Sequence, residues 1–176
     1  EYSTKYNPFN SMKALKHVEL WKLIMEGIVP FPRMVSLDPC GSCNFNCPHC
    51  NAAKSFDRDG VINEWSVVDV DGIVAMLTHW NTRAVCVGGG GEPLCNKHTE
   101  YLLRKLHAAG IKIGIVTNGT YIDKFADELG LCTWVGVSMD AGYSDVYAHM
   151  KGVAPTMFDK VVENINLLHK LHPELS

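Results

Sequence analysis

The sequence predicts an α/β fold built on a parallel sheet. Short apolar runs alternate with segments of helical periodicity along most of the chain. The runs are apolar along most of their length, which is typical of strands that helices cover. Polar and sulfur-bearing motifs follow directly after these runs, at the strand ends where such folds bind ligands. We therefore expect parallel strands joined by right-handed crossovers.

The first expected element is a helix over residues 11–26, whose apolar side chains recur at helical spacing. Gly27 ends it, and two prolines keep the following stretch extended. An apolar run over residues 34–37 then predicts the first strand. Residues 51–63 are polar and mixed in charge, which predicts a loop. Ser66 with Asp69 resembles a capping box that opens the next helix.

The remaining chain repeats a strand followed by a helix. Strands are expected at three further apolar runs, over residues 84–87, 111–116 and 133–137. Helices are expected over residues 99–109 and 122–129, and a last helix is expected where Thr156 and Asp159 form a cap. Four β–α units are thus visible after the N-terminal helix. Four strands do not close a barrel, so either the sheet is open or the chain stops before its last strands.

Composition excludes several classes of protein. The net charge of −3 argues against a nucleic-acid surface that works by charge alone. No apolar run is long enough to span a bilayer, and the first residues do not resemble a signal peptide. Seven cysteines, four of them between Cys40 and Cys50, form a poor disulfide framework. They indicate metal binding in a reducing compartment, so we expect a cytoplasmic protein without a membrane partner.

The four crowded cysteines are Cys40, Cys43, Cys47 and Cys50. Thiolates are the usual ligands of iron–sulfur clusters and of structural zinc. Three of them, spaced C-x3-C-x2-C, can converge within one loop on a four-iron cluster and leave one iron open to a further ligand. All four could instead bind zinc, although zinc sites usually separate their two pairs by a longer arm. If the three cysteines bind an iron–sulfur cluster, Cys40 is either a bystander or a fourth cluster ligand that would close the open iron.

A glycine run follows the second expected strand, ending in Gly90-Gly91-Glu92-Pro93. Glycines let backbone groups approach a ligand closely, and Glu92 adds an acceptor for a cationic amine. The run lacks the Lys-Ser or Lys-Thr of a phosphate loop. A flexible turn is the alternative explanation.

Polar side chains also follow the last two strands. Thr117-Asn118 closes the third strand, where Asn-Gly is in any case a good turn. Ser138 and Asp140 close the fourth and are expected to share a strand face. A helix cap or turn is the alternative for that pair. Lys151 follows further on, where a solvated surface lysine is the alternative. Cys86, Cys95 and Cys132 are interpreted as core or strand-end residues.

Together the cysteine loop and the Gly-Gly-Glu-Pro stretch resemble the radical S-adenosylmethionine (SAM) superfamily. The resemblance covers about residues 34–170. It implies a 4Fe-4S cluster on the three cysteines, with SAM on the open iron. The reduced cluster would cleave SAM to a 5′-deoxyadenosyl radical, which takes hydrogen from a substrate. No side chain is then expected to act as a conventional acid or base. By match with the family motifs, the implied SAM-binding residues are Gly90, Gly91, Glu92, Thr117, Asn118, Ser138, Asp140 and Lys151.

The resemblance also implies partners and a domain division. An electron donor such as flavodoxin or ferredoxin is expected. The stretch after Asp140 looks like the branch that carries a SPASM or twitch extension, whose members often modify peptides or proteins. Relatives usually have six β–α units, so we expect a truncated chain. The expected parts are an N-terminal helical extension (1–33) and a partial barrel (34–176). The alternatives are a non-catalytic zinc- or cluster-stapled binding module, and an α/β nucleotide-binding domain with incidental cysteines.

Overall fold

A computed structural model of the chain describes residues 17–52 and 64–176. The chain divides into two compact units, Glu1–Pro32 and Arg33–Ser176. The first contains α1 (Val18–Met25), which Gly27 follows with a φ of 78°. The first residues of the expected helix, 11–16, lie outside the described residues, as do residues 53–63 of the expected loop. No helix among the described residues is long and apolar enough to cross a membrane.

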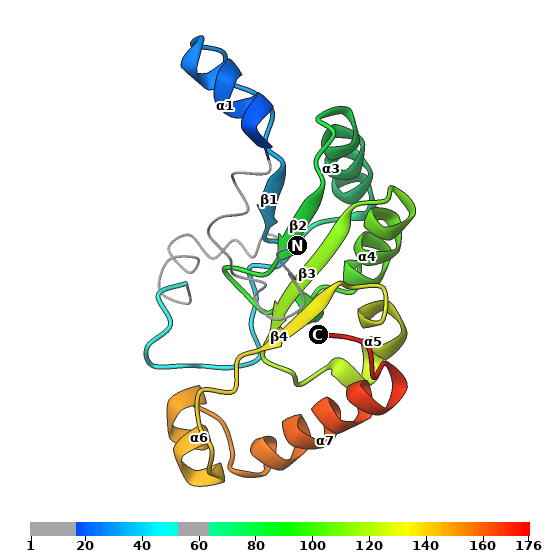
Figure 1. The fold of residues 1–176 in the computed structure, drawn as a ribbon. Coiled ribbons are helices and arrows are strands. Elements are labelled where there is room, and N and C mark those ends of the chain that lie inside the picture. Colours follow the sequence, from blue (N-terminus) through cyan, green and yellow to red (C-terminus); the bar gives the residue numbers. More distant parts are fainter. Residues whose placement is uncertain (1–16, 53–63) are drawn as a thin grey trace. The chain divides into compact units, whose positions relative to one another are not determined.

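The second unit is built on a parallel sheet of four strands in its described part (Figure 1). The strands are β1 (Met34–Leu37), β2 (Ala84–Val87), β3 (Lys112–Thr117) and β4 (Trp134–Val137). They pair in the order β1-β2-β3-β4, and every pair is parallel. The predicted fold class is confirmed. The bounds of the first two strands match the prediction, and the other two begin one residue later than expected.

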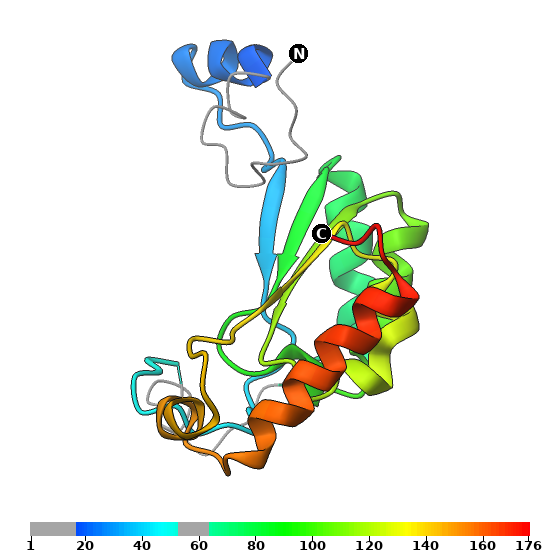
Figure 2. The same ribbon diagram turned by 60° about the horizontal axis from the view of Figure 1, so that its bottom comes forward.

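Helices connect the strands and cover one face of the sheet (Figure 2). These covering helices are α3 (Val67–His79), α4 (Thr99–Ala108), α5 (Ile122–Leu129) and α7 (Thr156–Leu171). The main core lies between them and the sheet, where Leu37, Val87 and Ile115 from three strands are almost fully buried. A further helix, α6 (Ser144–Lys151), lies beyond the carboxyl end of β4, and it was not predicted from the sequence. A single turn, η3 (Pro93–Cys95), follows the glycine run.

The two predicted helix caps have different outcomes. The Ser66 hydroxyl accepts from the Asp69 N–H at 3.3 Å, and the Asp69 carboxylate accepts from the Ser66 N–H at 2.8 Å. The predicted capping box of α3 is therefore confirmed. The predicted cap of α7 is wrong, because Thr156 is already the first helical residue and Pro155 precedes it without a side-chain cap. Pro155 has φ −55° and ψ −33°, so the chain turns into the helix one residue earlier.

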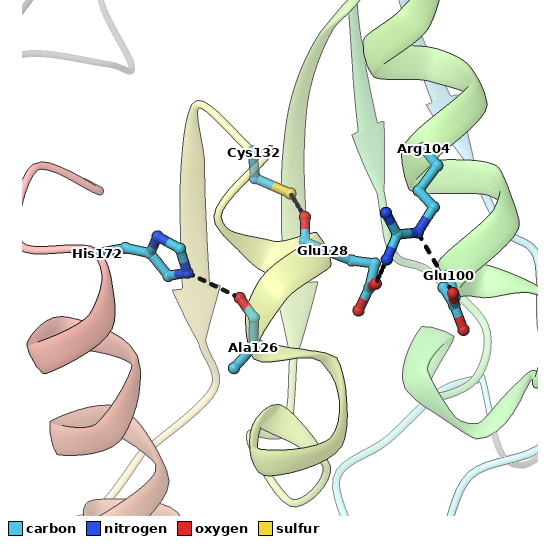
Figure 3. Close-up of polar contacts among 6 residues, drawn as sticks. All are labelled: Glu100, Arg104, Ala126, Glu128, Cys132 and His172. Carbon is cyan, nitrogen blue, oxygen red and sulfur yellow. Dashed lines mark hydrogen bonds and ion pairs between the residues drawn. The ribbon is translucent and has the colours of Figure 1, made fainter.

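Polar side-chain contacts join neighbouring helices (Figure 3). Arg104 of α4 pairs with Glu100 one turn earlier and with Glu128 of α5, whose side chain is 7% exposed. The His172 ring, just after α7, lies 3.1 Å from the carbonyl oxygen of Ala126 in α5. The Arg104 contact satisfies a buried carboxylate, which would otherwise be costly. These contacts connect α4, α5 and the end of α7 on the covered side of the sheet.

The opposite face of the sheet has a close approach between β3 and β4. Gly114 pairs directly with Trp134. Its neighbours Ile113 and Ile115 point into the helix-covered core, so position 114 faces away from it. A Cβ atom on Gly114 would overlap the Trp134 ring. The indole thus lies directly on the Gly114 backbone, which requires a residue without a side chain.

Candidate functional site

The predicted site residues gather at the carboxyl ends of the four strands. A pocket of about 220 Å³ opens there. Cys43, Cys47 and Cys50 line it from one loop, together with residues from the glycine run and from the ends of β3 and β4. Of the residues implied for SAM, the pocket is lined by Gly91, Glu92, Thr117, Asn118, Ser138, Asp140 and Lys151. Gly90 does not line it, although Gly89 does.

The three pocket cysteines differ in their surroundings. Burial raises the pKa of Cys43 and of Cys47, and the positive charge of Lys151 partly lowers that of Cys47. The Cys43 thiol accepts a hydrogen bond from the N–H of Phe45 at 3.4 Å. A thiol must lose its proton to bind metal, so a cationic neighbour favours binding. Across residues 17–52 and 64–176, no three His, Cys, Asp or Glu side chains converge closely enough for a single ion.

Cys40 lies apart from the other three thiols. It is fully buried and does not line the pocket. Its sulfur lies 3.2 Å from the Ser42 hydroxyl and 4.0 Å from the Glu64 carboxylate. Burial raises its pKa. This placement favours a bystander role for Cys40 over a fourth ligand of the same site.

The glycine run touches the cysteine loop through its backbone. The Glu92 N–H donates to the Ser42 carbonyl at 2.9 Å. A Cβ atom on Gly91 would overlap the carbonyl oxygens of Ser42 and Cys40, so only glycine fits there. The Gly90 N–H donates to the Asp38 carboxylate at 2.6 Å. Asp38 was not predicted as a site residue, because its only signal in the sequence is its position just after β1.

Glu92 is a buried carboxylate that connects two strand ends. It is 3% exposed, and burial raises its pKa. One oxygen accepts from the Thr117 hydroxyl at 2.6 Å and from the Leu94 N–H at 3.1 Å. The other accepts from the Asn118 N–H at 2.7 Å. These bonds partly offset the cost of burying the charge, and they fix the glycine run to the end of β3.

Asn118 continues this network to the cysteine loop. Its side-chain N–H donates to the side-chain amide oxygen of Asn44 at 2.7 Å. Its own side-chain oxygen accepts from the N–H and the hydroxyl of Thr120, at 3.0 and 2.6 Å. Asn118 therefore stabilises its own turn and also positions the cysteine loop. Sequence analysis did not select Asn44, which lies 74 positions away along the chain.

The end of β4 contributes a charged group to the pocket. The expectation that Ser138 and Asp140 share a strand face is wrong, because β4 ends at Val137 and Asp140 has a φ of 56°. Both nevertheless line the pocket. The Lys151 ammonium lies 2.5 Å from the Asp140 carboxylate and the Lys151 side chain is 3% exposed, so the surface-lysine alternative is also wrong. His49 lies 3.9 Å from the same carboxylate.

Helix α6 contacts the cysteine loop and supports it. The Asn46 N–H donates to the Lys151 carbonyl at 3.2 Å. Gly152 ends α6 with a φ of 64°, and a Cβ atom there would overlap the Asn46 backbone. Phe45 packs edge-on against Tyr147 of α6, with ring centroids 6.3 Å apart. The loop that holds the three thiols is thus seated on α6 by both packing and backbone contact.

Comparisons with known proteins agree on one family. A family model described as the radical SAM superfamily matches residues 38–174. An AdoMet-dependent heme synthase of Methanosarcina barkeri is 24% identical over 144 residues, which are 79% of this chain and 40% of that protein. An Fe-coproporphyrin III synthase of the same organism is 34% identical over 117 residues, which are 62% of this chain and 28% of that protein.

Solved structures share the fold. SuiB of Streptococcus suis, bound to the precursor peptide SuiA, matches with a TM-score of 0.62 and 24% identity. The match covers 88% of this chain and 34% of SuiB. SuiB bound to S-adenosylmethionine matches with a TM-score of 0.59 and 23% identity. The chain spans well under half the length of the relatives named here. The alternative of a zinc-stapled binding module gains no support from these comparisons.

Proposed function

This chain belongs to the radical SAM superfamily, whose members are enzymes, and we propose that its pocket binds a 4Fe-4S cluster and SAM side by side. Cys43, Cys47 and Cys50 would hold the cluster. The observation that carries the proposal is that these three thiols line the same pocket as the glycine run and Lys151. The remaining described cysteines lie outside its lining.

The donor set fits a cluster in two respects. Three thiolates on a four-iron cluster leave one iron open, and each thiolate binds a different iron, so the sulfurs need not converge on one point. The loop is also fixed from two sides, by the Gly91 backbone and by α6. When bound, the cluster would supply the electron that cleaves SAM to the 5′-deoxyadenosyl radical, which takes hydrogen from the substrate.

The side chains around the pocket would bind and orient SAM. A carboxylate offers about four acceptor positions, and three donors already occupy Glu92. The remaining position suits one N–H of the SAM ammonium group, while the backbone of Gly91, which lines the pocket, lies alongside. Lys151 would bind the SAM carboxylate. The carboxylate of Asp140 already pairs with Lys151 and would compete with SAM for it.

The other implied contacts follow from position. Thr117 and Asn118 lie at the end of β3, where the ribose is expected, and Ser138 lies at the end of β4. Asp140 would bind the ribose hydroxyls or the SAM amine. None of these side chains needs to act as a general acid or base. Their task is to hold SAM and to exclude water from the reacting atoms.

The substrate and the electron donor are proposed at the level of class. We propose that a peptide or protein is the substrate and that a flavodoxin or ferredoxin supplies electrons. What supports the peptide is the fold likeness to SuiB, whose structure was solved with a precursor peptide. We propose further that residues 34–176 form part of a barrel whose remaining strands lie in a longer protein, with residues 1–33 as an extension.

The proposal is tested by assembling the cluster anaerobically from iron and sulfide on the 176-residue chain. The reduced protein is then examined by EPR with and without SAM. A four-iron signal that changes on adding SAM supports the proposal. A signal indifferent to SAM contradicts the SAM site, and tightly bound zinc without any cluster contradicts the enzyme. Cys47→Ala should abolish the signal, whereas the matched control Cys40→Ala should keep both the signal and its response to SAM.

A further inference from the structure

Tyr147 carries a buried hydroxyl group that has no hydrogen-bond partner in the part of the chain that the structure describes. The side chain is fully buried in α6. Its hydroxyl oxygen and the Nε of Arg33 are the buried side-chain atoms without a hydrogen bond among residues 17–52 and 64–176. Such groups are rare in folded proteins, because burial removes water without replacing its hydrogen bond. Each one therefore requires a physical explanation.

Packing explains the aromatic ring but not the hydroxyl. The ring meets Phe45 edge-on at 6.3 Å and Phe158 edge-on at 5.6 Å. With Phe45 and Val161 it forms a small apolar cluster that is separate from the main core. Phenylalanine would make these same contacts and would leave no polar atom unsatisfied. The hydroxyl thus has a cost that packing alone does not offset.

The Tyr147 ring packs against the cysteine loop, which contributes Phe45. Cys47 packs against the small apolar group of side chains formed by Phe45, Tyr147 and Val161. Burial, followed by the negative charges of Cys47 and Asp140, raises the pKa of Tyr147 to about 12. Tyr147 does not itself line the pocket, so its contact with the site runs through Phe45 and Cys47. At neutral pH the hydroxyl keeps its proton and remains a donor.

Cluster binding would supply the missing acceptor. Without the cluster, the Cys47 side chain makes no hydrogen bond with the Tyr147 hydroxyl. The bound cluster converts this thiol to a thiolate and adds inorganic sulfides, both of which accept hydrogen bonds. Lys151, the nearby cation, is already paired with Asp140. The Tyr147 hydroxyl is thus a hydrogen-bond donor in the same apolar group as Cys47, and it has no acceptor among the residues that the structure describes.

Building on the proposed function, we propose that the Tyr147 hydroxyl donates a hydrogen bond to a sulfur atom at the Cys47 corner of the bound cluster. Hydrogen bonds to cluster sulfurs are one of the means by which proteins set the reduction potential. The reduced cluster carries one more negative charge and accepts the bond more strongly. Tyr147 thereby raises the potential and favours the reduced state from which SAM is cleaved.

The test compares Tyr147→Phe with Tyr143→Phe. Tyr143 precedes the same helix and is 75% exposed, so Tyr143→Phe removes only a hydroxyl that faces water. The first measurement is denaturant unfolding of the cluster-free chain. Tyr147→Phe should unfold at the same or a higher denaturant midpoint, because no bond is lost. A clearly lower midpoint would mean that the hydroxyl already has a partner inside the protein, and it would overturn the inference.

The second measurement is an EPR-monitored redox titration of the assembled cluster. Tyr147→Phe should shift the reduction equilibrium about tenfold toward the oxidised state, which for one electron is about 59 mV lower. Tyr143→Phe should leave the potential unchanged. Equal reduction potentials in the wild type and in Tyr147→Phe would overturn the inference. The proposed cluster site would still stand. Absence of any cluster in the wild type would instead overturn the proposed function, and the inference with it.

Discussion

Gly91→Ala is the substitution that tests most directly whether the glycine run must touch the cysteine loop. A methyl carbon added at Gly91 would lie 2.2 Å from the Ser42 carbonyl oxygen and 2.3 Å from that of Cys40. Ordinary van der Waals contact begins at 3.4 Å. Both obstacles are backbone atoms, so no side-chain rotation relieves the overlap. One of the two segments must move by about 1 Å.

The size of the effect follows from two contributions. Forcing an extra methyl group into a closely packed site costs about 1–3 kcal/mol. Moving the segments apart also breaks the bond from the Glu92 N–H to the Ser42 carbonyl, which contributes about 0.5–1.5 kcal/mol. We expect Gly91→Ala to lower the free energy of unfolding of the cluster-free chain by about 2–4 kcal/mol.

The assay is urea unfolding under reducing conditions, followed by the iron content after anaerobic assembly. Gly72→Ala is the matched control. Gly72 lies inside α3, and a Cβ atom there meets nothing within 4 Å. That substitution should stabilise the chain by about 0.5–1 kcal/mol, because alanine is the better helix former. Gly91→Ala should also bind less iron, since the loop that holds the thiols loses its support.

The reasoning would be refuted if Gly91→Ala were as stable as the wild type and bound a full complement of iron. The close approach between the glycine run and the cysteine loop would then be dispensable. A loss of stability with unchanged iron content would separate the two effects. It would show that the contact stabilises the fold without positioning the cysteines.

Two further predictions follow from buried groups. Glu92→Ala leaves the Thr117 hydroxyl and the Asn118 N–H without their acceptor, so urea unfolding should show a loss of about 3 kcal/mol or more; a loss near zero would mean that water replaces the carboxylate. Burial raises the pKa of Cys132 to about 12, so at pH 8 only about one thiol in ten thousand is ionised. Mass spectrometry after iodoacetamide treatment of the cluster-free chain should find Cys132 unmodified while the exposed Cys43 is labelled, and equal labelling would contradict its burial.

Local patterns were sufficient to predict the sheet. The runs that form β1 and β2 are short and apolar and have clear polar or glycine boundaries, so their bounds matched. The capping box at Ser66 and Asp69 is likewise a local device. Helix α6 was missed because its buried positions are Tyr147 and Lys151. These residues are four apart, as a helix requires, but a lysine in the buried stripe hides the apolar pattern.

The site was predictable in its parts but not in its connections. The three thiols, the glycine run and the strand ends could be selected because each has a local motif. The bonds between them join distant positions, such as Asn44 and Asn118, 74 residues apart. They depend on how the strands and loops meet in space, which no local pattern encodes. The burial of Lys151 depends in the same way on Asp140, which a left-handed backbone turn presents to it.

The contact between Gly114 and Trp134 has an evolutionary consequence. These two residues are direct partners across β3 and β4, and they share one fixed volume. A larger residue at position 114 is compatible with this packing only when position 134 carries a smaller one. In an alignment of relatives, side-chain size at the two positions should therefore vary in opposite directions. A relative that keeps the tryptophan but replaces the glycine would have to turn the indole into another rotamer or shift the two strands apart.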